Sequence, residues 1–312
     1  MRILITGGAG FIASNIADAY ASEGHEIMVI DNLSSGKKEN VPAAARFVLC
    51  DIASDTAAEA VRTFRPEVVS HHAAQINVRA SVADPVFDAQ VNIIATIRLL
   101  EACRQNGTRK FIFASSGGAG YGEQERFPAD ETHPLRPVSP YGAAKVSVEC
   151  YLNFYRAQYA LDFTALRYSN VYGPRQDPHG EAGVVAIFCR RFLRGQAAII
   201  NGDGEQTRDY VYVGDVVRAN QAALTRGGGL GINIGTGIET SVNTLFRTLR
   251  DLSGSRQEEI HGPGMAGEQR RSCLENRLAL DELGWYPEVF LEEGLARTYS
   301  FFRETTKASD TW

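Results

Sequence analysis

The sequence predicts an α/β fold in which helices cover both faces of a doubly wound parallel sheet, followed by a smaller mixed α/β part. Short runs rich in β-branched residues alternate with helical stretches through the first half of the chain. This alternation is typical of strand–helix–strand units, whose right-handed crossovers build a parallel sheet. The predicted strands are Arg2 to Thr6, Glu26 to Ile30, Arg46 to Leu49, Glu67 to Ser70 and Lys110 to Phe113.

The clearest helix signal lies between the fourth and fifth predicted strands. Asp84 and Pro85 mark its start, because an N-cap side chain followed by a first-turn proline favours helix initiation. Gly107 marks its end. Between them, apolar residues recur at helical spacing at Val91, Ile94, Leu99, Leu100 and Cys103. We therefore expect one amphipathic helix between Asp84 and Gly107.

The pattern of elements changes near residue 170. Beyond it, loops rich in Gly, Pro and Arg separate scattered helices, as in the segment from Val171 to Arg175. The sequence therefore predicts a first domain over residues 1–170 and a second over 171–312. A later segment, residues 209–236, is expected to return to the first domain, since domain boundaries need not be a single cut.

Composition narrows the class of protein. Of the 312 residues 44% are apolar and 22% charged, and the net charge of −5 offers no attraction for nucleic acid. No apolar run approaches the roughly 20 residues that span a bilayer as a helix. Met1 leads directly into a strand, and the five cysteines form no CxxC pair. We expect a cytoplasmic protein with reduced thiols and neither nucleic acid nor membrane as a partner.

A glycine-rich turn directly after the first strand predicts a dinucleotide site of the Rossmann type. Gly7 and Gly10 lie where a strand meets a helix, and a side chain there would block a pyrophosphate from the backbone amides. Phe11 and Ile12 begin that helix. Asp31 ends the second strand about 20 residues later, where a carboxylate binds ribose hydroxyls and repels a 2′-phosphate. NAD is therefore the expected cofactor.

Tyr141 and Lys145 stand four residues apart, on one face of a helix if the segment is helical. A free phenol has a pKa near 10, and lowering it to about 7 requires roughly 4 kcal/mol of stabilisation of the phenolate. The Lys145 cation and a positively charged nicotinamide together can supply this. Tyr141 is thus the predicted general base, and Lys145 the group that lowers its pKa and holds the nicotinamide ribose.

The spacing Gly7-x-x-Gly10-x-x-Ala13, together with the Tyr141/Lys145 pair, resembles the extended short-chain dehydrogenase/reductase family. The resemblance implies that Ser116 hydrogen bonds to the reacting oxygen of the substrate. Gly120 and Ala13 depart from that family's pattern, which generally has a bulkier residue and a third Gly there. The resemblance implies further cofactor contacts at Asn32, Asp51, Ile52, Ala73, Ala74, Gln75 and Asn92.

The substrate side of this resemblance points to a UDP-sugar. The segment from Leu166 to Arg175 is similar to the one that binds the nucleotide diphosphate in that family, and Met265 stands where the family generally offers a further diphosphate Arg. Arg270 or Arg271 are candidates to compensate. The resemblance implies that Ser272 lies beside the sugar's C2 substituent. Its small side chain would leave space there for an N-acetyl group. The implied substrate contacts are Asn170, Val184, Val185, Arg208 and Ser272, in addition to Ser116 and Tyr141.

The resemblance implies an NAD-dependent epimerase that inverts C4 of a UDP-hexose through a transient 4-keto intermediate, and a homodimer. The loop before Tyr121 carries no carboxylate, which argues against sugar dehydration or decarboxylation. His71 and His72 point to opposite faces of a strand, so no metal site is expected. Two alternatives stay open: a nucleotide-sugar reductase, and a catalytically silent NAD-binding regulatory protein.

Overall fold

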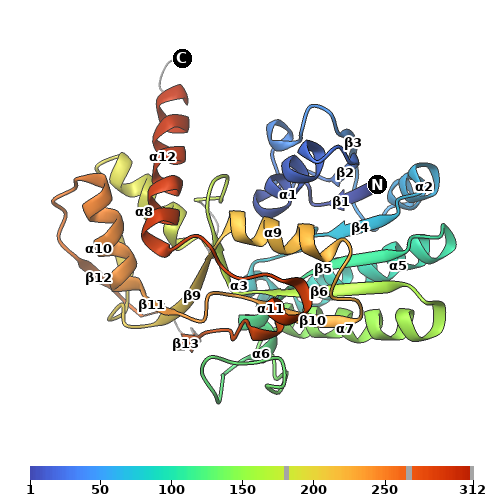
Figure 1. Ribbon diagram of the computed structural model, residues 1–312. Helices are drawn as coiled ribbons and strands as arrows, with labels where there is room; N and C mark the ends of the chain where they lie inside the picture. Colours follow the sequence, from blue (N-terminus) through green and yellow to red (C-terminus); the bar gives the residue numbers. More distant parts are fainter. Residues whose placement is uncertain (179–182, 265–268, 310–312) are drawn as a thin grey trace.

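The computed structural model describes residues 1–178, 183–264 and 269–309. Its largest element is a parallel sheet of seven strands in the order β10-β6-β5-β4-β1-β2-β3 (Figure 1). The strand order reverses between β1 and β4, and in such sheets ligands bind outside the carboxyl ends of the strands at that point. The strands are β1 Arg2–Thr6, β2 Glu26–Asp31, β3 Arg46–Leu49, β4 Val68–His71, β5 Lys110–Ser116, β6 Asp162–Tyr168 and β10 Leu230–Ile234.

The predicted doubly wound parallel sheet is confirmed, and all five predicted strands are present. Three of them extend beyond the predicted carboxyl end. β2 includes Asp31, β4 includes His71, and β5 continues to Ser116, so the predicted site residues Asp31 and Ser116 are the last residues of their strands. The carboxyl edge of the sheet therefore holds the glycine turn, Asp31 and Ser116 together.

Helices cover both faces of this sheet (Figure 1). Ile3 and Ile5 of β1 pack with α1 and α9 in one buried cluster, whereas Leu4 packs with α2, α5 and α7 in another. This alternation follows from the two-residue period of a strand. The covering helices are α1 Phe11–Ser22, α2 Asp55–Phe64, α5 Ala95–Gln105, α7 Pro140–Tyr159 and α9 Val213–Ala223.

The helix predicted between Asp84 and Gly107 is interrupted. Asp84 caps α4 (Pro85–Ala89) as predicted, by accepting a hydrogen bond from the Phe87 amide. A π-turn, η2 (Gln90–Ile94), then joins α4 to α5. Its extra residue rotates the following positions around the helix axis. As a result Ile94, which the apolar pattern placed inside, is 50% exposed, and the prediction of one regular helix is wrong.

The later part of the chain forms a second packed layer. β9, β11, β13 and β7 make a small sheet, and α8, α10 and α12 form a core with it (Figure 1). β10 returns to the large sheet beside β6, and Leu283 of α11 packs in the first core. The division at residue 170 stays a prediction. The bounds are β7 Asn170–Tyr172, α8 Val184–Leu193, β8 Ile199–Asn201, β9 Thr207–Tyr212, β11 Glu239–Ser241, α10 Val242–Ser253, β12 Ile260–Gly262, β13 Arg271–Ser272, α11 Arg277–Leu283 and α12 Leu291–Ser309.

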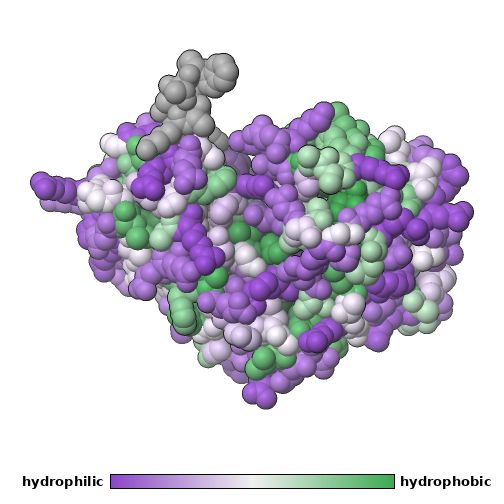
Figure 2. All heavy atoms as spheres, turned by 45° about the horizontal axis from the view of Figure 1, so that its top comes forward, coloured by the Kyte–Doolittle hydropathy of each residue, from purple (hydrophilic) through white to green (hydrophobic). Residues whose placement is uncertain are grey.

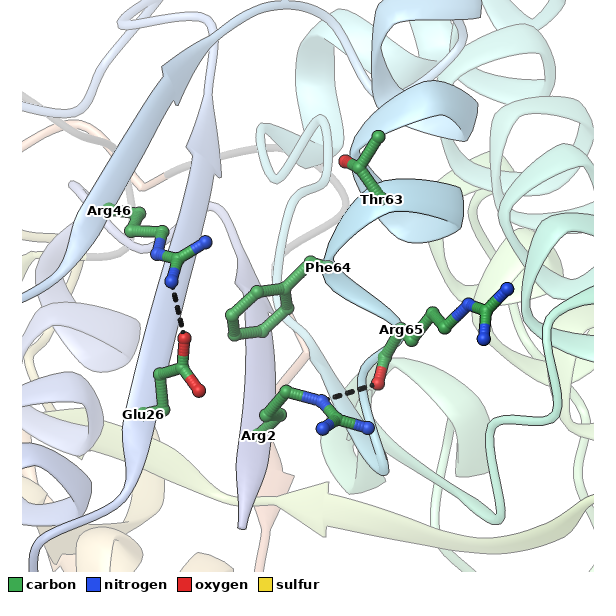
Figure 3. Close-up of a pocket in the computed structure, with 6 residues that line it drawn as sticks. All are labelled: Arg2, Glu26, Arg46, Thr63, Phe64 and Arg65. Atoms are coloured by element: carbon green, nitrogen blue, oxygen red, sulfur yellow. Dashed lines mark hydrogen bonds and ion pairs between the residues drawn. The ribbon is translucent and has the colours of Figure 1, made fainter.

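The surface is mostly hydrophilic on the face that Figure 2 shows, with small hydrophobic patches. Within the described residues, no helix has the length and apolar character needed to cross a membrane. A surface pocket is lined by Arg2, Glu26 and Arg46 at the starts of β1, β2 and β3 (Figure 3). It therefore lies at the amino ends of the strands, opposite the edge that holds the glycine turn.

Candidate active site

The glycine turn is fitted tightly against the loop that follows β4. Gly7 has φ +68°, and a Cβ atom added to it would lie 2.7 Å from the Ala73 nitrogen, so only glycine is accommodated. Gly10 is the N-cap of α1, and it makes no side-chain capping bond. The first turn of α1 also carries no acidic residue. Its backbone amides and the positive end of the helix dipole therefore suit an anionic group such as a pyrophosphate.

Asp31 connects this turn to the end of β2. Its buried carboxylate accepts hydrogen bonds from the Ala9 amide at 3.0 Å and from the Leu33 amide at 2.7 Å. Each carboxylate oxygen has a second lone pair, so both can still accept from ribose hydroxyls. Beside it, the Asn32 amide donates to the exposed Asp51 carboxylate at 3.1 Å. The predicted adenosine contacts Asp31, Asn32 and Asp51 thus lie together.

The loop from Ala73 to Gln75 is held by the π-turn. The Asn92 side chain accepts from the Gln75 amide and donates to the Gln75 carbonyl, both at 2.9 Å. At the other end of the loop, the Ala73 amide donates to the Thr6 hydroxyl at 3.2 Å. The loop of predicted cofactor contacts, Ala73 to Gln75, therefore lies against the glycine turn, and the buried Asn92 supports it from behind.

Tyr141 and Lys145 of α7 lie beside the end of β5, whose last residue is Ser116. The buried Lys145 ammonium donates to the Ala114 carbonyl at 2.8 Å and lies 5.6 Å from the centre of the Tyr141 ring. Ser116 caps the short helix α6 (Gly117–Tyr121) by accepting from the Ala119 amide at 3.3 Å. A hydroxyl that accepts one bond retains its proton for donation to a substrate oxygen.

The electrostatics of this pair differ from the prediction in one respect. Burial lowers the pKa of Lys145 to about 8, and the carboxylates of Asp88 and Glu149 oppose this effect. Burial raises the pKa of Tyr141 to about 12, with the Asp88 carboxylate as the second cause. Without a cofactor the pKa of Tyr141 is therefore raised, whereas the expected lowering depends on Lys145 and the nicotinamide together.

Close backbone contact joins the loop of Ser116 to the helix of Tyr141. A Cβ atom at Gly142 would lie 2.4 Å from the Ala119 carbonyl oxygen. A residue with a side chain at position 142 would therefore not allow α7 to approach α6 this closely. At Gly120, one of the departures noted in the sequence, an added Cβ would meet nothing nearer than 3.6 Å. Gly142 is thus sterically required and Gly120 is not.

This difference gives a matched pair of variants. Gly142→Ala is expected to lower kcat by about 100-fold, because a displacement of about 1 Å between reacting groups has effects of that size. Gly120→Ala, in the same junction, is expected to retain kcat within about twofold and to raise stability by about 0.4–1 kcal/mol. Steady-state kinetics and urea unfolding measure both. Equal activity of the two variants would contradict this account of the junction.

Three of the predicted substrate residues lie on the small sheet. Asn170 of β7 pairs with Tyr210 of β9, and Ser272 of β13 pairs with Arg208 of β9. Ser272 is buried, and a Cβ atom at Gly118 would lie 3.2 Å from its hydroxyl oxygen. The loop that follows Ser116 therefore adjoins the strand that carries Ser272.

The other predicted substrate residues differ in how accessible their side chains are. Val184 is half-buried at the start of α8, whereas Val185 is 1% exposed in the core of the second layer. A contact from Val185 would therefore have to use its backbone. Met265 lies outside the described residues. Both arginines considered as its substitutes are already paired, Arg270 with Asp203 and Arg271 with Glu239.

The two adjacent histidines have separate environments. His71 lies between the hydroxyls of Thr6 and Thr96, at 2.6 and 2.9 Å. His72 contacts the Ser70 hydroxyl at 3.0 Å, and burial lowers its pKa to about 3. The two imidazoles therefore have different partners and do not converge on a common point.

Sequence reasoning missed a buried ionic network behind the site. Arg167 of β6 forms an ion pair with Glu149 of α7 at 2.6 Å and donates to the Tyr121 hydroxyl at 2.9 Å. Glu149 also accepts from the Ser115 hydroxyl at 2.6 Å. Glu149 follows Lys145 by one helical turn and Ser115 precedes Ser116, so the network supports both. The four-residue spacing from Lys145 to Glu149 was the available signal.

The chain is similar to known proteins over nearly its whole length. Residues 3–235 match the model of the NAD dependent epimerase/dehydratase family. The UDP-glucose 4-epimerase of Mycolicibacterium smegmatis is 47% identical, over 98% of this chain and 100% of that protein. The crystal structure of the Thermotoga maritima UDP-glucose 4-epimerase with UDP-glucose has a TM-score of 0.96 at 50% identity, covering 98% of this chain and 100% of that one. The Thermus thermophilus UDP-glucose 4-epimerase complex with NAD has a TM-score of 0.91 at 45% identity, covering 97% and 99%.

Proposed function

Because the chain belongs to the NAD dependent epimerase/dehydratase family, we propose that it inverts C4 of a UDP-hexose, interconverting UDP-glucose and UDP-galactose through a transient 4-keto sugar. The observation that supports this proposal is the position of Lys145, beside the Tyr141 ring and hydrogen bonded to the end of β5, where Ser116 is the last residue, at the same edge of the sheet as the glycine turn. No net oxidation occurs, since the sugar is oxidised at C4 and then reduced there.

The residues present fit NAD. The first turn of α1 offers uncapped amides after Gly10, and Asp31 keeps free lone pairs beside that turn. When bound, the nicotinamide supplies the acceptor for the hydride of C4 and returns it to the opposite face of the sugar. Asp31 also favours NAD over NADP, because a carboxylate repels a 2′-phosphate.

Tyr141 moves the proton of the C4 hydroxyl. It takes this proton as C4 is oxidised and returns it when the keto sugar is reduced. Burial and the Asp88 carboxylate raise its pKa to about 12, and a positive charge brought close by the cofactor would lower it. Ser116 donates a hydrogen bond to the same sugar oxygen. Lys145 fixes the nicotinamide ribose from its position on Ala114.

The nucleotide is held on the small sheet. Asn170 and Arg208 are proposed to bind the diphosphate, since a guanidinium suits phosphate oxygens. Val184 and Val185 are proposed to line the uridine side through the start of α8. Tight binding there and loose binding of the sugar would let the keto sugar turn over without leaving.

Ser272 is proposed to set the tolerance at the sugar's C2 substituent. Its small buried side chain adjoins Gly118, next to the loop of Ser116. Ser272→Tyr is expected to suppress turnover of UDP-N-acetylglucosamine by about 100-fold while sparing UDP-glucose, because the ring would occupy the space of the acetyl group. Parallel kcat/KM measurements test this, and equal losses on both sugars would contradict it.

We also propose a homodimer. Large apolar side chains are exposed on adjacent helices: Val82, Val86, Phe87 and Ile94 lie on the 78–94 segment, which includes α3 (Val78–Ala83), and Tyr151 and Phe154 lie on α7. A second copy would cover this face. Light scattering is expected to give the mass of two chains for the wild type and the mass of one chain for Phe87→Glu.

We propose that the protein works in the cytoplasm. The five cysteines are free, which supports a reducing compartment.

A panel of UDP-sugars, incubated with the purified protein and no added cofactor, tests the proposed function. Conversion of UDP-galactose to UDP-glucose is expected, with no consumption of nicotinamide. A nucleotide-sugar reductase would instead need added reduced cofactor in stoichiometric amounts. A catalytically silent NAD-binding protein would leave every sugar unchanged.

A further inference from the structure

Asp88 of α4 is a buried carboxylate that the proposed reaction does not yet use. It is fully buried, and its Oδ1 accepts from the side-chain amides of Gln75 at 2.9 Å and Asn92 at 3.0 Å. Its Oδ2 is buried and has no hydrogen-bond partner among the described residues. An incompletely compensated buried charge costs several kcal/mol. Such an atom in a folded protein calls for a functional explanation.

Asp88 lies on a helix that packs against the helix of Tyr141 and Lys145. α4 packs against α7, and the Tyr141 amide at the start of α7 donates to the Ser81 hydroxyl of α3 at 3.2 Å. Asp88 precedes the π-turn, a rare element that is frequent at functional sites. The π-turn brings Asn92 onto both Asp88 and the loop at Gln75. Asp88 is therefore fixed in place on a helix that packs against α7.

We infer that Asp88 is a positioning residue of the proposed reaction: its fixed negative charge keeps Lys145 cationic in a desolvated site and keeps the proton on Tyr141 until a second positive charge lies beside them. The inference rests on the proposed function, in which these two groups hold the ribose and move the proton. Its consequence is that proton release by Tyr141 depends on the charge of the bound nicotinamide.

The electrostatics agree with this role. Burial lowers the pKa of Lys145 to about 8, and the Asp88 carboxylate is the first of the groups that oppose this. The same carboxylate adds to the effect of burial in raising the pKa of Tyr141. The other carboxylate of the site, Glu149 of α7, is paired with Arg167.

The other titratable groups around the pair are two histidines and Arg79. Burial is the main cause that lowers the pKa of His71 of β4 and of His72, which falls to about 3, so both imidazoles are neutral near pH 7. Arg79 of α3 is exposed. Asp88 is the carboxylate that acts on both Tyr141 and Lys145, whereas Glu149 acts on Lys145.

Two uncharged variants of the full-length protein, Asp88→Asn and Asp88→Ser, test the inference. Removal of the negative charge eases proton loss from both Tyr141 and Lys145. Both limbs of the pH profile of kcat are thus expected to move about one pH unit toward acid in both variants. Lys145 is proposed to hold the nicotinamide ribose, so its deprotonation at high pH should weaken NAD binding. Calorimetry is expected to show that this weakening begins about one pH unit lower in both variants. Asp84→Asn removes the same charge from an exposed side chain of the same segment and is expected to leave both profiles unchanged.

Three outcomes would overturn the inference. Profiles of both variants that overlay the wild type would do so, and so would an equal shift in Asp84→Asn. A wild-type profile in Asp88→Asn with a change only in Asp88→Ser would assign Asp88 to hydrogen bonding alone, since Asn keeps an acceptor for Gln75 and Asn92. Thermal unfolding shows which variants are folded. A wild-type protein that converts no nucleotide sugar counts against the proposed function instead, and the NAD-binding profiles then still test Asp88.

Discussion

Tyr141→Phe is expected to lower kcat with UDP-galactose by about 10²–10⁴-fold while leaving NAD binding nearly unchanged. General acid–base catalysis contributes rate factors of this size. The substitution removes one hydroxyl, and the ring keeps its place beside Lys145. The losses in kcat and in kcat/KM should be similar, because the hydroxyl acts on the proton that moves in the transition state.

Tyr151→Phe is the matched control for this experiment. Tyr151 lies on the same helix α7, is 40% exposed and has no role in the proposed reaction. It should therefore retain wild-type kcat. If Tyr141→Phe retained near-normal turnover with NAD bound, the assignment of Tyr141 as the proton-transfer residue would be wrong.

Glu149→Ala is expected to lower the free energy of unfolding by about 3–5 kcal/mol. It leaves the buried guanidinium of Arg167 without its carboxylate, and breaking a buried ion pair from one side has an effect of this size. The Ser115 hydroxyl also loses its acceptor. Urea unfolding measures the loss. Activity should fall in the folded fraction too, since Ser115 adjoins Ser116 and Glu149 lies one turn beyond Lys145.

Two further variants complete the Glu149 experiment. Asp281→Ala breaks the exposed pair between Arg277 and Asp281 and should change stability by about 1 kcal/mol or less. Glu149→Leu combined with Arg167→Leu should recover part of the stability, because it removes both charges. A loss below about 1 kcal/mol in Glu149→Ala would show that the network does not support the site.

The positions of the strands were predictable because their signal is local. A buried parallel strand needs a short β-branched run, and the glycine turn follows the first strand in sequence. The pairing of β4 with both β1 and β5 then brings the strand ends to one edge. Ser116, Tyr141 and Lys145 were predicted from spacing and from the family resemblance; Ser116 ends β5 and the other two lie on α7, and their roles stay predictions.

The polar groups beneath the site were not predictable in the same way. Asp88, Asn92 and Thr96 follow each other at four-residue spacing and are all buried. On a regular helix, apolar periodicity directs Ile94 inward instead, and only the π-turn reverses this. Gly142 is a similar case: its need for glycine comes from the Ala119 carbonyl, which lies over 20 residues earlier in the chain. Such contacts arise from tertiary packing, which one sequence does not display.

The fate of the C4 hydrogen is the most direct test of the central claim, that C4 is oxidised and then reduced within one binding event. UDP-galactose labelled with deuterium at C4 can be incubated with the protein in ordinary water, with no added cofactor, and the product examined by NMR. We expect UDP-glucose that keeps the deuterium at C4. Loss of the label to solvent, or conversion only on addition of stoichiometric nicotinamide, would contradict the account.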